Sequence, residues 1–418
     1  MKRNFRPFAR WLIGTCALAA LCTDVQAQSA EKSGGHEEAP AFALHGFGTF
    51  GLTHSSSDQA DFIRDFSQPD GVAGKWSAKN DSIFGVQGNL SVSEQIEGVA
   101  QIVSRYGNEG NFDPELMWAF ARYEPNAYLS LRIGRLGTDF YMLADSRLVG
   151  YSYLPVRPPG DYFGTLPFPH IDGLDAVVTL PVADGVLRGK LFSGFLDGEV
   201  PSVGKQWDLH GSRMSGGHLD YQINDWLWRV GYAQLRFKNN VPIDELLDAL
   251  RAGAQLGLPG AAAAADAQSV GGKLSQFYSA GAVFDRGPFQ VQLMLSKIRQ
   301  ESAVFENTHA GYLIASYRSG AWTPFAGYSR VKSTTRHLAA TGVGPAMDAT
   351  IAYLQSRAHS DQHTSFVGVR WDVGTNVALK AQYDAIRGAA ESVFQFQRVQ
   401  PGWNGRTNVL SVTLDFVF

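Results

Sequence analysis

The 418-residue chain contains only two cysteines, Cys16 and Cys22, and both lie within its first 27 residues. The rest of the chain can therefore form neither a disulfide framework nor a thiolate metal site. It also has no excess of positive charge, because residues 28–418 carry 32 Lys and Arg against 38 Asp and Glu. This balance gives no indication of nucleic-acid binding. A Gly-rich phosphate cradle is missing too, and we expect no cofactor.

Long apolar runs are scarce as well. Beyond residue 27 no run approaches the ~20 residues that a membrane-spanning helix needs. The apolar run 11–21 follows a basic stretch and precedes small residues at 25–27, which predicts a secretory signal peptide over residues 1–27. We expect residues 28–41 to form a flexible periplasmic tail and residues 42–418 to form a single folded domain. The basic residues of the signal are Lys2, Arg3, Arg6 and Arg10.

Strand-like segments of about ten residues follow one another through the folded domain. Apolar side chains occupy every second position in many of them, as in Phe289, Val291, Leu293 and Leu295. Without spanning helices, a membrane protein must pair every backbone amide, and only a closed barrel does so. We predict an all-β, transmembrane antiparallel β-barrel of about sixteen strands, at 42–53, 82–92, 96–106, 115–123, 127–135, 173–181, 186–196, 207–222, 226–237, 275–284, 289–299, 309–318, 321–330, 363–372, 376–386 and 406–418.

The connections between these strands alternate strictly between short and long. Tight turns are rich in turn-forming residues, and a barrel with periplasmic turns and external loops requires this alternation. The strand predicted at 207–222 is irregular around Gly211, which indicates a bulge or an additional hairpin. The long links fall at 54–81, 107–114, 136–172, 197–206, 238–274, 300–308, 331–362 and 387–405.

The last strand alternates apolar and mostly polar residues and ends on the aromatic Phe418. Its apolar set is Leu410, Val412, Leu414, Phe416 and Phe418. This segment resembles the closing strand of Gram-negative outer-membrane β-barrels, which the barrel-assembly machinery is thought to read through the terminal Phe. The alternative is a half-buried edge strand of a soluble β-sandwich.

Residues 129–136 read L-S-L-R-I-G-R-L and lead into the long link 136–172. This resembles the step into the inward-folded third loop of the general porins of Gram-negative bacteria, and the length, strand count and loop rhythm are similar along residues 42–418. In place of the enterobacterial Pro-Glu-Phe-Gly-Gly-type signature, the loop carries R-P-P-G-D-Y at 157–162. The resemblance implies a homotrimeric diffusion channel in the outer membrane, in contact with lipid and lipopolysaccharide, that passes small hydrophilic solutes and ions. A substrate-specific channel is the near alternative.

A passive pore needs a narrow wet passage and charges that bias which solutes pass. Strand parity places a basic wall in the lumen, with Arg135 added on the expectation that a bulge at Gly134 turns it inward. Together with loop residues of both signs, the wall would create a transverse field; alternatively, the charges pair to hold the loop in place. The wall candidates are Arg132, Arg135, Arg188, Lys190, Arg229, Arg370 and Lys380; the loop candidates are Asp139, Asp145, Arg147, Arg157, Asp161 and Asp172.

Three further features of the sequence bear on function. Residues 244–258 predict a short amphipathic helix, followed by a flexible Ala-rich run at 261–265. The ten histidines show no paired ligand spacing, so we expect no metal site. A barrel hydrolase is the rival from another class, because Asp208, His210 and Ser212 lie close in sequence, but no nucleophile elbow accompanies them. We therefore expect no catalytic residues.

Overall fold

The computed structural model describes residues 41–139, 141–164, 169–202, 204–393 and 396–418. The predicted signal peptide and all but the last residue of the predicted tail lie outside the described residues. No described helix is both long and apolar enough to cross a membrane.

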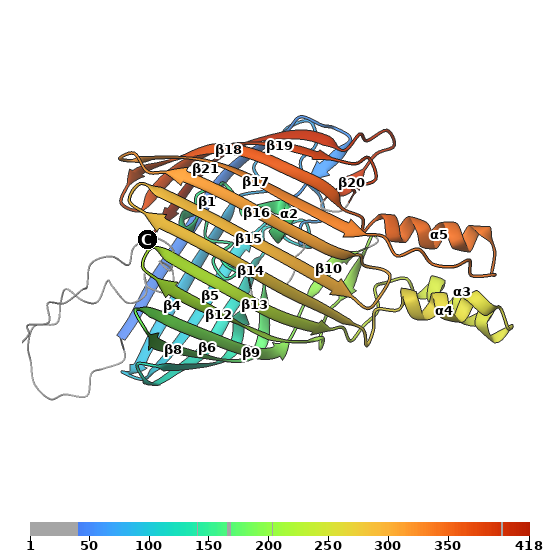
Figure 1. Cartoon of the computed structure of the whole chain (residues 1–418), viewed down its shortest axis with the longest axis horizontal. Helices are drawn as coiled ribbons and strands as arrows, with labels where there is room; N and C mark the ends of the chain where they lie inside the picture. The colour runs from blue at the N-terminus through green and yellow to red at the C-terminus, as the bar shows by residue number, and fades with distance from the viewer. Residues whose placement is uncertain (1–40, 140, 165–168, 203, 394–395) are drawn as a thin grey trace, which may run out of the picture. The chain divides into compact units, whose positions relative to one another are not determined.

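Sixteen antiparallel strands form a closed barrel, as the sequence predicts (Figure 1). Each strand pairs with its neighbour in the chain, and β1 closes the ring by pairing with both β4 and β21. The strands are β1 (Ala41–Ser55), β4 (Ile83–Ser93), β5 (Ile96–Arg105), β6 (Pro114–Asn126), β7 (Leu129–Gly137), β8 (His170–Val182), β9 (Gly185–Phe195), β12 (Arg213–Ile223), β13 (Trp226–Arg236), β14 (Leu274–Arg286), β15 (Phe289–Gln300), β16 (Asn307–Tyr317), β17 (Trp322–Thr334), β18 (Asp361–Gly374), β19 (Val377–Gly388) and β21 (Arg406–Val417).

The seam between the first and last strands is continuous from Phe47 opposite Val417 to Ser55 opposite Val409. The Phe418 amide donates to the Gly46 carbonyl at 2.9 Å, and the Gly46 amide donates back to the Phe418 carbonyl at 2.8 Å. A Cβ on Gly46 would overlap the Phe418 ring, so the small residue lets the terminal aromatic side chain lie across β1. The C-terminal residue thus takes part in closing the barrel.

The two faces of the wall differ in polarity. Outward positions leave large apolar side chains exposed, such as Leu191 at 72% and Phe50 at 66%. Inward positions near the seam carry buried Thr53, Ser411 and Asp415. This period-2 separation is what a strand with one oily and one polar environment requires.

Aromatic pairs mark both ends of the outer surface. The rings of Trp322 and Trp371 stack 5.0 Å apart beside the short turns, and those of Tyr232 and Tyr278 lie 5.1 Å apart nearer the long loops. Trp118 does not belong to this outer surface, because it pairs with inward-facing Gln101 and packs against the buried core.

Most of the irregular structure lies in the long connections. The predicted start of the strand at 207 is wrong: residues 205–208 belong to a separate hairpin of β10 (Glu199–Ser202) and β11 (Lys205–Asp208), and β12 begins at Arg213. Two short segments from distant loops, β2 (Ala60–Phe62) and β20 (Phe396–Val399), pair with each other, and β3 (Trp76–Ser77) adds to β1.

Helices in two loops extend beyond the loop end of the barrel (Figure 1). The predicted amphipathic helix is present as α3 (Asp244–Gln255), but the Ala-rich run is helical rather than flexible and forms α4 (Pro259–Gln268). The helix α5 (Pro345–Ser356) was not predicted, because its apolar residues show only a weak helical periodicity.

Candidate functional site

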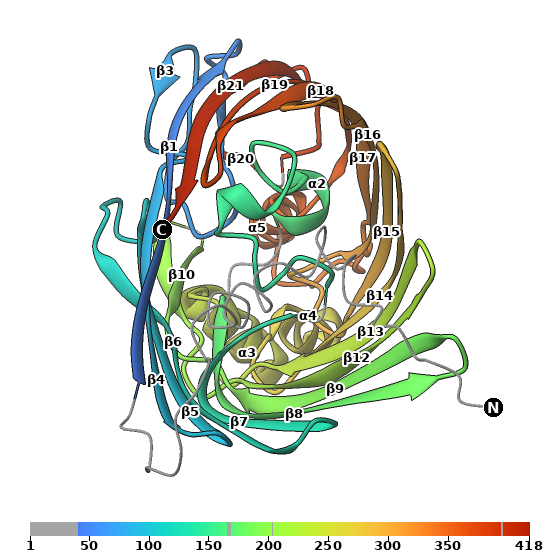
Figure 2. The same ribbon diagram turned by 90° about the vertical axis from the view of Figure 1, so that its left-hand side faces the viewer.

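The described part of the third long loop, residues 138–139, 141–164 and 169, folds into the barrel, as Figure 2 shows for its helix α2 (Gly160–Phe163) inside the ring of strands. A short 3-10 helix, η1 (Gly150–Ser152), lies against β1 and β21, whereas α2 lies against β16, β17 and β18. The prolines at 155, 158 and 159 cannot donate backbone hydrogen bonds, so this stretch relies on contacts with the wall. A Cβ at Gly150 would overlap Asp415 and Thr49, which explains a glycine at the closest approach.

Arg157 anchors the loop to the barrel seam. Its guanidinium contacts both carboxylate oxygens of Asp81, at 3.0 and 2.8 Å, and a carboxylate oxygen of Asp384 at 3.0 Å. It also lies over the Phe62 ring, and only 4% of the residue is exposed. Burial alone would lower the pKa of Arg157, but the two carboxylates outweigh burial and raise the pKa, so the cation is retained.

Two basic wall residues hold the loop by its backbone. The Lys380 ammonium donates to the Gly150 carbonyl at 2.6 Å and to two further loop carbonyls, and lies 3.2 Å from the Asp415 carboxylate. Arg370 donates to the Tyr151 carbonyl at 2.6 Å, and its guanidinium lies 4.5 Å from the centre of the Tyr151 ring. Since these cations are engaged by loop carbonyls, they contribute to the position of the loop.

A second charged network lies on the other side of the lumen. The Lys190 ammonium bridges loop residue Asp139 at 2.8 Å and wall residue Asp175 at 3.0 Å. Arg132 binds the same Asp175 carboxylate through two nitrogens, at 2.9 and 2.5 Å. Arg229 donates to the Asp139 carbonyl at 3.4 Å and forms a bidentate pair with a neighbouring wall carboxylate. The start of the loop is thereby tied to β9 through Lys190 and to β13 through Arg229.

Asp161 in α2 is buried among neutral donors. Its carboxylate accepts hydrogen bonds from Ser329 at 2.6 Å and Gln362 at 2.7 Å. Burial raises the pKa of Asp161 above its ordinary value, because these hydrogen bonds only partly replace lost hydration. The adjacent Tyr162 ring packs edge-on against Tyr312 of β16, with ring centres 5.1 Å apart.

Two of the predicted site residues, Asp145 and Arg188, are more accessible to the solution than the paired residues above. Asp145 lies exposed on the inserted loop, and Arg188 on β9 is half-buried. Neither has a hydrogen bond or ion pair with another described residue. They have opposite sign and are the candidates best able to act on a passing solute.

Arg147 occupies a buried cluster of cations. The cluster combines Arg147 with Arg64 of the first long loop and Arg105 of β5, and Asp65 is the carboxylate close to Arg105, at 3.7 Å. Burial lowers the pKa of Arg147, Asp65 opposes this shift and the two neighbouring guanidinium groups reinforce it, which together bring the pKa to about 10. The Nη1 atom of Arg147 has no hydrogen-bond partner within the described ranges.

Arg135 does not turn inward as expected. The register of β7 with β8 continues unbroken through Gly134, which has a φ of +132°, so Arg135 keeps the outward parity of Ile133. There it pairs with Asp172 at 2.8 Å and Asp197 at 2.6 Å. Asp172 was also misplaced, because it belongs to β8 and shares this outward face. The backbone accommodates Gly134 without the extra residue that a bulge would need.

The first long loop also enters the lumen, which no sequence pattern predicts. Arg64 donates to the Arg147 carbonyl and to the Tyr153 hydroxyl, both at 2.8 Å, and its guanidinium lies 3.4 Å from Asp81. Strand parity could have identified the missed wall acids, since they all lie at inward positions. No local pattern marks Arg64 or Asp81, whose roles depend on contacts between loops. The missed wall acids are Asp175, Asp220, Asp384 and Asp415.

The three residues of the hydrolase alternative, Asp208, His210 and Ser212, do not form a catalytic pair of nucleophile and general base. His210 Nδ1 lies 3.0 Å from Asp197, and the Ser212 hydroxyl accepts a hydrogen bond from the Lys238 amide at 3.1 Å. No hydrogen bond joins Ser212 to His210 in the described part of the chain. Likewise, the described residues contain no group of three or more His, Cys, Asp or Glu side chains that could hold a metal ion.

Comparisons with solved structures find the same kind of barrel. The chain is similar to an anion-selective porin from Comamonas acidovorans, with 14% identity, a TM-score of 0.54, and coverage of 91% of this chain and 100% of that one. It is also similar to the outer membrane channel DcaP of Acinetobacter baumannii, with 11% identity, a TM-score of 0.54, and coverage of 91% and 97%. A third similar structure is a loop-deletion mutant of OmpT, an outer membrane protein of Vibrio cholerae, with 12% identity, a TM-score of 0.54, and coverage of 91% of this chain and 100% of that one.

No family model and no curated protein sequence matches this chain. At these identities, the structural similarity establishes a porin-like barrel fold that resembles outer-membrane proteins of Gram-negative bacteria.

Proposed function

We propose that this protein is an outer-membrane porin, a passive diffusion channel for small hydrophilic solutes and ions. The observation that carries the proposal is the combination of an apolar outer wall, a lumen lined by buried polar and charged groups, and a third loop bound to the inner wall at both ends. A closed barrel in lipid satisfies its backbone and leaves the lumen to water and solutes. Solutes would cross down their concentration gradient.

Within the lumen, the charges divide into two roles. Arg157, Lys190 and Lys380 are engaged by carboxylates or loop carbonyls and keep the loop in position. Arg188 and Asp145 are free of such contacts, and we propose that they bias the passage of ions. The transverse field expected from the sequence then arises from these two residues and from the cation cluster around Arg147, because the charges of the other paired groups largely cancel.

Single-channel recording in planar lipid bilayers tests both statements. The full chain, produced in the outer membrane and purified in detergent, should give discrete conductance steps. In a salt gradient, Arg188→Ala should shift the reversal potential toward cation selectivity, and Asp145→Ala should shift it toward anion selectivity. Arg286→Ala is the control, because this exposed residue is the last of β14, beside the short turn to β15. The absence of channels from folded protein would refute the pore.

A liposome-swelling assay with a panel of sugars, amino acids and organic acids distinguishes a general porin from a substrate-specific channel. Swelling rates that decrease smoothly with solute size support the general porin. Saturation of transport by a single solute would instead identify a specific channel.

The assembly and the targeting of the protein complete the proposal. We propose a homotrimer in contact with outer-membrane lipid and lipopolysaccharide, exported by a signal peptide over residues 1–27 and inserted by the barrel-assembly machinery through Phe418. Cross-linking in native membranes reports the trimer, N-terminal sequencing reports cleavage before Gln28, and deletion of Phe418 should reduce insertion.

A further inference from the structure

The outer surface of the barrel carries a concentrated basic patch near the loop ends of β15, β16 and β17. Lys297, His309 and Lys332 form one continuous row, each opposite the next in the strand register. Arg299 lies one outward position above this row on β15, and Arg330 one below it on β17. Alternation along each strand places all five side chains on the face away from the lumen.

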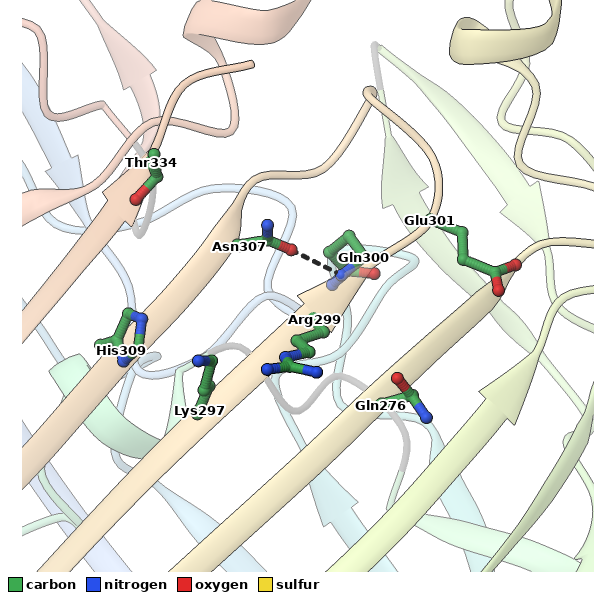
Figure 3. A pocket seen from close by; sticks show the side chains of 8 residues that line it. All are labelled: Gln276, Lys297, Arg299, Gln300, Glu301, Asn307, His309 and Thr334. Atoms are coloured by element: carbon green, nitrogen blue, oxygen red, sulfur yellow. Dashed lines mark hydrogen bonds between the residues drawn. The ribbon is translucent and has the colours of Figure 1, made fainter.

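Three of them, Lys297, Arg299 and His309, line a hollow (Figure 3) with a cavity volume of about 480 Å³. Gln276, Asn307 and Thr334 add neutral hydrogen-bonding groups to its rim. Two carboxylates are also near: Glu301 lines the hollow, and Asp361 lies 3.4 Å from Arg330 and 3.5 Å from Lys332. No described carboxylate pairs with Lys297 or Arg299.

The patch changes to an apolar surface within one outward position. Along β15 the outward residues run from Arg299 and Lys297 to Leu295 and Leu293, of which the two leucines are 55% and 42% exposed. On the neighbouring strand Gly311 lies opposite Leu295, and the Leu295 side chain extends over the glycine, where a Cβ would come within 2.8 Å of it. A ligand that covers both regions must carry anionic charge next to hydrocarbon.

We propose that this patch binds a lipid of the outer leaflet whose headgroup carries phosphate. The cations would contact the phosphate oxygens while the acyl chains pack on the leucines below. A free phosphate would leave the apolar part of the surface unused. A second copy of the chain offers little complementary charge, because Asp172 and Asp361 are the outward-facing acids of the described barrel strands, and Arg135 already pairs with Asp172. This inference needs the barrel in a membrane and is independent of solute passage.

Native mass spectrometry of the full chain in detergent, titrated with bisphosphorylated lipid A, tests the proposal. The variant Lys297→Gln/Arg299→Gln should bind about 30-fold more weakly, because each cation near a charged lipid contributes roughly fivefold. The matched control is Arg213→Gln/Arg236→Gln, which removes two outward cations that lie opposite each other at the loop ends of β12 and β13.

A second measurement depends on no substitution. The unaltered protein should bind dephosphorylated lipid A at least tenfold more weakly than the bisphosphorylated form. Equal weakening in the patch variant and the control, or equal binding of the two lipids, would overturn the proposal. Loss of oligomer without loss of lipid in the patch variant would also overturn it, since the patch would then be a protein interface. Bilayer conductance should be unchanged in both variants.

Discussion

Removal of Arg157 should release the third loop from the barrel seam. The guanidinium is buried and contacts Asp81 and Asp384, whose side chains are 0% and 6% exposed. Loss of one partner from a buried ion pair costs about 3–5 kcal/mol, because the remaining charge is left without compensation. Asp81 keeps its contact with Arg64 at 3.4 Å, and Asp384 keeps a hydrogen bond from Gln382 at 2.7 Å. The expected cost is therefore near the lower limit, about 3 kcal/mol.

Hydrogen exchange measured by mass spectrometry reports this loss directly. The Val156 amide donates to Gln382 at 2.8 Å and exchanges only when the loop leaves the wall. A cost of about 3 kcal/mol corresponds to roughly 150-fold faster exchange in Arg157→Ala. The control Arg330→Ala removes an exposed pair at 3.4 Å, which should change exchange by less than about fivefold.

A double-mutant cycle sharpens the test of the buried pair. Asp384→Asn should be strongly destabilising alone but nearly neutral in the Arg157→Ala background, because the charge it removes is then already uncompensated. If Arg157→Ala exchanges at the rate of the control, or if the two substitutions are additive, the ion pair does not hold the loop and the reasoning fails.

Three further predictions concern the same loop. Burial raises the pKa of Asp161, so the contribution of its protonated form to stability is present below pH ~4 and is lost as the pH rises through the raised pKa. Asp161→Asn should therefore remove this pH dependence from the unfolding midpoint. If the midpoints of the variant and the unaltered protein change with pH in parallel, the assignment is wrong. Tyr162→Ala should destabilise the docked loop by about 3–5 kcal/mol, measured by the same amide exchange, whereas Tyr162→Phe should cost much less. Gly150→Ala should displace η1 from Asp415 and Thr49 and alter single-channel conductance; an unchanged conductance would show that the loop adjusts without moving.

The regular part of the fold was predictable because its determinants are local. All sixteen strands were anticipated, fifteen of them within a few residues, from a period of two in polarity and from the alternation of short and long links. The error at 207–222 arose because β11 and β12 are both extended and are separated only by a tight turn near Gly211, which has a φ of +76°. Polarity alone does not distinguish a bent strand from a hairpin that precedes one.

The site was predictable only in part. Arg132, Lys190, Arg229, Arg370 and Lys380 lie at inward positions of their strands, because alternation determines which face a strand residue occupies; their role in the pore stays a prediction. Partners could not be inferred in the same way, since contacts such as Arg157 with Asp384 join residues far apart in the chain. The entry of the first loop into the lumen has no local signal at all.

The sequence by itself determined an antiparallel barrel with an oily exterior and a polar interior, because backbone pairing and side-chain alternation are set by neighbouring residues. Only the tertiary structure decided which lumenal charges are neutralised and which remain free. That outcome depends on how two loops share the limited space inside the barrel, where each buried charge must find a partner.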